Sequence, residues 1–333
     1  MFIINNKQKK QGEFNMNNFR KIGLTALAGS LVASVAVAGD LAVTGSAEMA
    51  VKNHSHDSNG KSVSMVNSVN FAGSGETDGG LTVNLSFELD QGAGNGTGPF
   101  DNHKVSVGSE TLGTLAVHGH GGSNSAAAID ATAAGDLWDN TFGISTGTGG
   151  NSPKSGAGGN NLVVYTLPAL ADGVAITGSY SSDGANNEGS GALGLVYTGV
   201  EGLTVSVGTA EDNSVVAVNA DYTTMKVAYA YGSITAGISS SEYDHTTAAN
   251  DQEVKSWNLA YTVSDAISVS YGQEKIENNL DTADIETDGI TASYTSGGMV
   301  VTAKKYGADN VDGSSTGVNN NNEFWKLSAS FAF

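Results

Sequence analysis

Hydrophobic and polar residues alternate one by one over many short stretches of the chain. In "LTVNLSFELD", residues 81–90, apolar residues occupy the odd positions and polar residues the even positions. The same alternation recurs in "WNLAYTV" (257–263), "ISVSYG" (267–272) and the final "EFWKLSASFAF" (323–333). A period of two places the apolar side chains on one face of an extended strand and the polar side chains on the other. The pattern therefore predicts β-strands whose two faces meet different surroundings.

Strands are the main regular structure expected after residue 40, where no helical repeat lasts longer than a few turns. The tenth expected strand is overlong: it includes part of a loop or comprises two strands, and two strands would spoil the even count. We expect sixteen strands, which cover roughly residues 41–53, 63–75, 80–91, 103–111, 113–121, 161–168, 173–183, 188–199, 202–212, 214–231, 234–244, 253–263, 266–278, 286–296, 299–309 and 323–333.

The connections differ systematically in length. After even-numbered strands they are short, as in "TLG", "VEG" and "SGG"; after odd-numbered strands they are often long and polar, as in "HSHDSNGKS" and "NVDGSSTGVNNNNE". Short turns at one end and long loops at the other are typical of outer-membrane barrels. Strands cross lipid only as a closed barrel, because an open edge would expose unpaired backbone groups. The expected fold class is all-β, a transmembrane antiparallel β-barrel of about 16 strands with a water-filled lumen.

The N-terminal segment has the features of an export signal. In "MNNFRKIGLTALAGSLVASVAVAGD", two basic residues precede an apolar stretch that ends in Ala-Val-Ala, an A-x-A cleavage site. A transmembrane anchor is the alternative, but the apolar stretch is short and is interrupted by glycine and serine. We expect a signal peptide at 16–38 and a mature barrel at 39–333. We interpret residues 1–15 as an upstream extension assigned in error, with Met16 as the true start.

Composition and charge exclude several classes of protein. The chain has no cysteine and therefore neither disulfides nor a cysteine-based metal site. Removal of residues 1–38 leaves ten lysines, no arginine and 33 acidic residues, a formal net charge of 10 − 33 = −23. Nucleic-acid binding is excluded as a function, because phosphate contacts need a basic surface.

From its leader, its first strand "GDLAVTGSAEM" and its ending "FWKLSASFAF", the chain resembles the general diffusion porins of Gram-negative bacteria, most closely those of alphaproteobacteria. The resemblance covers residues 16–333. It implies an outer-membrane location, contact with membrane lipid and a homotrimer in which each subunit has its own pore. It also implies that Phe331 and Phe333, in the last strand, are read by the barrel-assembly machinery.

One connection is far longer than the others: residues 122–160, after the fifth strand. A loop of this length is usually functional or disordered. The resemblance implies that it folds into the barrel and narrows the pore. Its alanine-rich first part predicts a short helix against the wall. We expect Leu137, Trp138 and Phe142 to anchor the loop, and Asp130, Asp136 and Asp139 to face the aperture.

Parity within the strands predicts which ionisable side chains line the lumen. His118 and His120, two residues apart on one strand, form a candidate metal or pH-sensing pair, but a pore-lining role is the favoured interpretation. The acidic loops offer oxygen ligands for Ca²⁺, although no run has the spacing of a calcium-binding loop; otherwise we expect no cofactor. No catalytic arrangement of nucleophile, base and acid can be named. The expected pore-lining residues are Lys104, His118, His120, Lys226, Lys304 and Lys326.

These observations favour a porin that admits small hydrophilic solutes and ions by passive diffusion, with a weak preference for cations because of its acidic charge. A plugged structural or adhesive barrel that displays long external loops is the main alternative. A soluble secreted β-protein also explains the alternation, but it explains neither the loop asymmetry nor the terminal aromatic strand.

Overall fold

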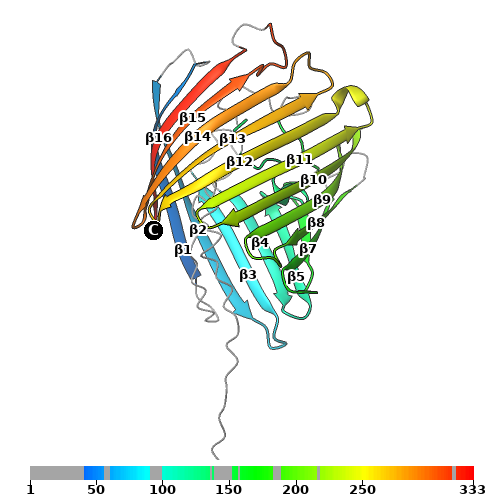
Figure 1. Ribbon diagram of the computed structural model, residues 1–333. Helices are drawn as coiled ribbons and strands as arrows, with labels where there is room; N and C mark the ends of the chain where they lie inside the picture. The colour runs from blue at the N-terminus through cyan, green and yellow to red at the C-terminus, as the bar shows by residue number, and fades with distance from the viewer. Residues whose placement is uncertain are drawn as a thin grey trace, which may run out of the picture.

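The computed structural model of the chain is a closed antiparallel β-barrel (Figure 1). It describes residues 41–55, 61–90, 100–135, 137–138, 152–156, 158–182, 189–215, 218–316 and 320–333. Every strand pairs with its neighbours in sequence, and β1 pairs with β16 to close the barrel. The sixteen strands are β1 (Leu41–His54), β2 (Lys61–Glu76), β3 (Thr82–Asp90), β4 (Phe100–Ser109), β5 (Gly113–His120), β6 (Leu162–Thr166), β7 (Val174–Ser181), β8 (Ser190–Tyr197), β9 (Leu203–Val215), β10 (Val218–Tyr231), β11 (Ile234–His245), β12 (Gln252–Ser264), β13 (Ile267–Asn278), β14 (Ile285–Ser296), β15 (Met299–Asp309) and β16 (Asn322–Ala332).

The predicted barrel and its sixteen strands are confirmed, but most expected boundaries differ from the observed ones by one to four residues. Residues 214 and 215 belong to the end of β9, whereas the alternation assigned them to the tenth strand. The alternation placed the turn too early because β9 and β10 form one long hairpin whose pairing extends to Val215 and Val218. Helical structure in the described residues is confined to the short 3₁₀ turns η2 (Ala127–Ile129) and η5 (Ala248–Asn250). None of the described helices is long and apolar enough to cross a membrane.

The two faces of the strands have the expected chemistry. Outward positions of β1 and β2 carry apolar side chains, and Val63 is 81% exposed on the isolated chain. The inward positions of β16 carry Lys326, Ser328 and Ser330. Burial of an outward apolar face requires lipid or another subunit, because water would leave it unfavourably exposed.

The seam of the barrel extends to the last residue. Beyond β16, the backbone N–H of Phe333 donates to the Gly45 carbonyl at 3.0 Å, and the Gly45 N–H donates to the Phe333 carbonyl at 2.7 Å. The Phe333 ring lies over Gly45, where a Cβ atom would be only 2.4 Å from Cε2 of the ring. The terminal residue thus completes the pairing of β1 with β16, and its ring fills the space left by a glycine.

Candidate functional site: the lumen and its inward-folded loop

The connection between β5 and β6 turns into the barrel and follows its inner wall. Glycines at inward positions make room for the loop backbone on β8, β9 and β13. A Cβ atom on Gly194 would lie 2.4 Å from the Ser125 carbonyl oxygen, and one on Gly272 would lie 2.7 Å from the Ala134 Cβ. Any larger residue at these positions would force the loop away from the wall.

Asn124 organises the entry of the loop. Its Oδ1 accepts hydrogen bonds from the backbone N–H groups of Ala126 (2.9 Å) and Ala127 (2.8 Å), and so fixes the start of the η2 turn. Its Nδ2 donates to the carbonyl of Gly156, on the returning limb, at 2.6 Å. One almost fully buried amide therefore connects the two limbs of the loop. The alanine-rich segment forms only the three-residue η2 turn, because Asp130 at its end has a φ angle of 71°, which is incompatible with a longer helix.

Asp130 is held by the barrel wall. Its Oδ2 accepts from the Lys226 ammonium of β10 at 3.0 Å, and the same ammonium donates to the Thr132 carbonyl at 2.8 Å. Ser239 Oγ of β11 donates to the Ala131 carbonyl at 3.1 Å. Asp130, expected to face the aperture, and Lys226, expected to line the pore, therefore form one ion pair, whose charges offset each other.

Glu274, on the inward face of β13, fixes the next part of the loop. Its two carboxylate oxygens accept hydrogen bonds from the backbone N–H groups of Leu137 (3.0 Å) and Trp138 (3.1 Å). Glu274 is only 2% exposed, and such charge-assisted bonds are stronger than neutral ones. A single side chain of the wall therefore positions the backbone of two of the three predicted anchor residues.

Apolar packing supports the same position. Leu137 is 2% exposed, and Trp138 packs against the same cluster from its edge. The cluster comprises Leu137 and wall or near-wall residues of β12 to β16, namely Val254, Ile276, Ile285, Tyr306, Ala308, Val311 and Phe324. Phe142, Asp136 and Asp139 lie outside the described residues.

The returning limb is tied to β12. Gln252 donates from Nε2 to the Ser152 carbonyl at 2.9 Å and accepts from the Lys154 backbone N–H at 2.7 Å. The Lys154 ammonium donates to the Asn250 carbonyl at 2.8 Å. Burial lowers the pKa of the Lys154 ammonium, and the carboxylates of Asp251 and Asp281 partly offset this. Both described limbs of the loop are thus held by the barrel wall.

The inner wall at the barrel seam carries a row of three lysines. Lys326 of β16 lies directly opposite Lys52 of β1 and Lys304 of β15, all at inward positions. Glu48 forms an ion pair with Lys326 at 2.5 Å, and the Lys304 ammonium lies 5.6 Å from the centre of the Tyr306 ring. The row therefore has a net positive charge at one level of the lumen.

The structure places the remaining predicted residues on β4 and β5. Lys104 and His118 are register partners at inward positions, and His120 contacts the Asp101 carbonyl through Nδ1. Among the described residues, no group of three or more histidine and carboxylate side chains has the arrangement of a metal site.

Sequence reasoning missed Lys52, Glu48 and Glu274. Lys52 and Glu48 share the inward parity of the first strand, and this signal was available from the alternation alone. Glu274 has the same inward parity on its strand, but its contact with Leu137 joins residues 137 positions apart. No local pattern encodes such a pairing.

A closed sixteen-stranded barrel with an apolar outer face, a polar lumen and an inward loop defines the class of membrane diffusion channels. The model of the Gram-negative porin family matches residues 23–314, and the chain belongs to this family. It is an outer-membrane channel of a Gram-negative bacterium.

Solved structures share the fold at low sequence identity. An anion-selective porin from Comamonas acidovorans superposes with a TM-score of 0.66 at 15% identity, over 89% of this chain and 100% of that chain. The trimer form of OmpT, an outer membrane protein of Vibrio cholerae, gives 0.63 at 17% identity, over 89% and 100%. A mutant of Rh. blastica porin gives 0.62 at 16% identity, over 88% and 100%. No curated protein matches the sequence.

Proposed function

We propose that residues 122–160 form the constriction of this porin, and that the opening admits small hydrophilic solutes and ions without catalysis or energy coupling. The observation that carries the proposal is the path of the loop, which is bonded to inward side chains of β7, β10, β11, β12 and β13 in turn. A loop held along the inner wall reduces the cross-section of the lumen. Size exclusion then follows from the opening that remains.

We further propose a weak preference for cations. The formal charge of −23 after removal of residues 1–38 supports it, as do the acidic residues of the long connections. Asp130 contributes little, because Lys226 offsets its charge. We therefore assign the preference chiefly to Asp136, Asp139 and the acidic loops, against the opposing field of the lysine row.

The assembly we propose is a homotrimer with one pore in each subunit. Exposed apolar side chains on the outer face of β1 and β2, such as Val63 and Met65, supply a surface that one subunit can bury against another. A related fold, OmpT of Vibrio cholerae, is described in a trimer form, which also supports this assembly.

A planar bilayer experiment tests the three proposals together. Purified protein should insert with conductance steps in groups of three, and a KCl gradient should give a reversal potential on the cation side. The triple variant Asp130→Asn, Asp136→Asn, Asp139→Asn should shift that potential toward anions, while Asp130→Asn alone should change it little. An unchanged ion ratio in the triple variant would exclude a role for these carboxylates. Stable insertion without conductance would favour the plugged adhesive barrel instead.

A further inference from the structure

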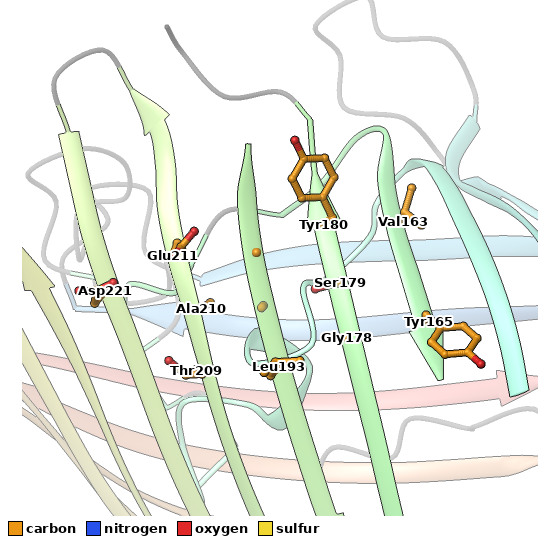
Figure 2. Close-up of a pocket in the computed structure, with 12 residues that line it drawn as sticks. Val163, Tyr165, Gly178, Ser179, Tyr180, Leu193, Thr209, Ala210, Glu211 and Asp221 are labelled. Carbon is orange, nitrogen blue, oxygen red and sulfur yellow. The ribbon is translucent and has the colours of Figure 1, made fainter. Parts of the chain in front are cut away.

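The outer surface of the barrel is hollowed over β6 to β10. The hollow has a volume of about 570 Å³, within the range of small-molecule sites. The register places its lining residues Tyr165, Gly178 and Leu193 on the outward face, so the hollow opens toward the membrane and is separate from the lumen. Figure 2 shows the rings of Tyr165 and Tyr180 at its border and the carboxylates on the neighbouring strands.

Two glycines create the hollow. Gly178 of β7 and Gly191 of β8 both point outward, between the side chains of Tyr180 and Leu193. A Cβ atom on Gly191 would meet no atom within 4 Å. Tyr180 is 53% exposed and Leu193 60% exposed, so both stand above the glycine floor. The result is an apolar groove in this part of the outer wall.

A row of carboxylates lies beside the groove. Glu211 of β9 is directly opposite Asp221 of β10, and Asp221 is directly opposite Asp244 of β11. Glu211 and Asp221 line the hollow itself. Like charges directly opposite each other destabilise a sheet. None of the ion pairs formed within the described residues includes any of these three side chains.

The neighbouring acidic row provides an internal contrast. Glu253 of β12 lies opposite Glu277 of β13, again facing outward. There, Lys255 pairs with Glu253 at 2.7 Å and Lys275 pairs with Glu277 at 2.9 Å. Within the described part of the chain, lysine ammonium groups pair with the acids of the β12–β13 row and with none of the acids at the groove.

We propose that this groove binds one membrane lipid whose headgroup carries a primary amine, with an acyl chain over Gly178 and Gly191 and the ammonium between Glu211 and Asp221. The carboxylates lie toward the barrel end at which the odd-numbered strands finish, next to apolar positions such as Val207 and Met225. An amphipathic ligand matches an apolar groove that has carboxylates at one end. The proposal extends beyond solute passage, since it concerns the outer face only.

Physical considerations favour an amine-bearing lipid over the other occupants. A divalent metal is disfavoured because these carboxylates do not form a metal-binding group in the described residues. Apolar burial alone gives no selectivity within a membrane, where lipid tails are already in an apolar medium, so packing against small residues must provide the fit. The ammonium then gives the specificity through charge-assisted hydrogen bonds.

Native mass spectrometry of the delipidated full-length mature protein in detergent tests the proposal. The probes are phosphatidylethanolamine and phosphatidylglycerol with identical acyl chains. We expect the ethanolamine lipid to bind about fivefold more tightly, as one partly screened ion pair provides. The double variant Glu211→Gln, Asp221→Asn should lower this ratio to about one. Glu286→Gln, an outward acidic residue of β14 far from the groove, is the matched control and should keep the ratio.

A second variant tests the groove independently of charge. Gly191→Leu should reduce the retention of both lipids because its side chain fills the floor, without loss of the folded barrel on a gel of unheated sample. Equal binding of the two lipids to the wild type, or an unchanged ratio in the double variant, would overturn the proposal. Loss of the oligomer in Gly191→Leu without loss of lipid would show that a second subunit occupies the groove, which would also overturn it.

Discussion

At the scale of single residues, the position of the loop depends on Glu274. We expect Glu274→Gln to loosen the loop, because an amide presents only one oxygen acceptor to the N–H groups of Leu137 and Trp138. Hydrogen bonds to a charged group contribute about 1.5–3 kcal/mol each, so the loss is large on the scale of one loop. Single-channel recording should show a larger mean conductance and more current noise.

The control for this change lies on the same strand. Glu277→Gln removes an equal charge, but Glu277 faces outward and pairs with Lys275. Its conductance should equal that of the wild type. If Glu277→Gln and Glu274→Gln behaved alike, the effect would reflect charge alone and the clamp would be refuted.

The glycines of the inner wall lead to a second expectation at this scale. Gly272→Val should push Ala134 off β13, since even a Cβ atom there would be 2.7 Å from the Ala134 Cβ. Overpacking of this kind costs about 1–3 kcal/mol. The size limit for the uptake of sugars by proteoliposomes should therefore change. Gly75→Val, at a position of β2 where a Cβ would meet nothing within 4 Å, should leave the limit unchanged.

At the scale of elements, strands and loop differ in how far sequence predicts them. Each strand is encoded locally, because its two faces meet lipid and water and every second residue must match. The strand starting at Met299 was therefore predicted to the residue. The path of the loop depends on contacts such as that of Ala133 with Ser256, which are 123 positions apart. It also depends on inner-wall glycines, which leave space for the loop but produce no recognisable pattern in the sequence. Only the folded barrel brings these together.

The seam between β1 and β16 can be weakened by changing one residue, Phe333. Phe333→Ala keeps both backbone hydrogen bonds to Gly45 and loses the ring, whereas deletion of Phe333 also removes the bonds, a loss of about 2 kcal/mol. The temperature at which the refolded barrel unfolds on a detergent gel should fall in that order. A larger loss in outer-membrane level than in refolding would support recognition of the terminus by the assembly machinery. Equal melting of all three proteins would refute the role of the seam.

The connection between β13 and β14 carries an acid that is sensitive to pH. Burial raises the pKa of the Asp281 carboxyl above its ordinary 3.8; the hydrogen bond from Asn278 and the charge of Lys154 partly offset this, and Asp284 and Asp312 add to the shift. The folded state then binds more protons than the unfolded state above about pH 3.8, so this group lowers stability as pH rises through the raised pKa. Asp281→Asn should therefore melt at a higher temperature than the wild type at neutral pH, and the gain should disappear near pH 3. Circular dichroism melts at both values check this; a gain independent of pH would contradict it.

At the scale of the whole molecule, net charge and local charge oppose each other. The chain carries 34 acidic residues and 15 basic residues, yet three of its lysines share one level of the lumen. An ion in the narrow part of a pore responds to the nearest charges, because water and salt screen the distant ones. Selectivity is thus decided by the balance between the loop acids and this row, and not by the net charge alone.

The row itself provides the decisive test of that balance. Lys52→Gln with Lys304→Gln removes two unmatched positive charges, while Lys326 stays because Glu48 needs its partner. A unit charge several ångströms from an ion in water changes its energy by about 0.5 kcal/mol, with opposite sign for cations and anions. Loss of two such charges changes the difference between the two ions by about 2 kcal/mol, so the cation-to-anion permeability ratio should rise about thirtyfold. Reversal potentials in a KCl gradient measure this ratio, and Lys255→Gln on the outer face of β12 should leave it unchanged. If the double variant instead kept the wild-type ratio, the permeating ions would not approach this wall, and the aperture would have to lie elsewhere in the lumen.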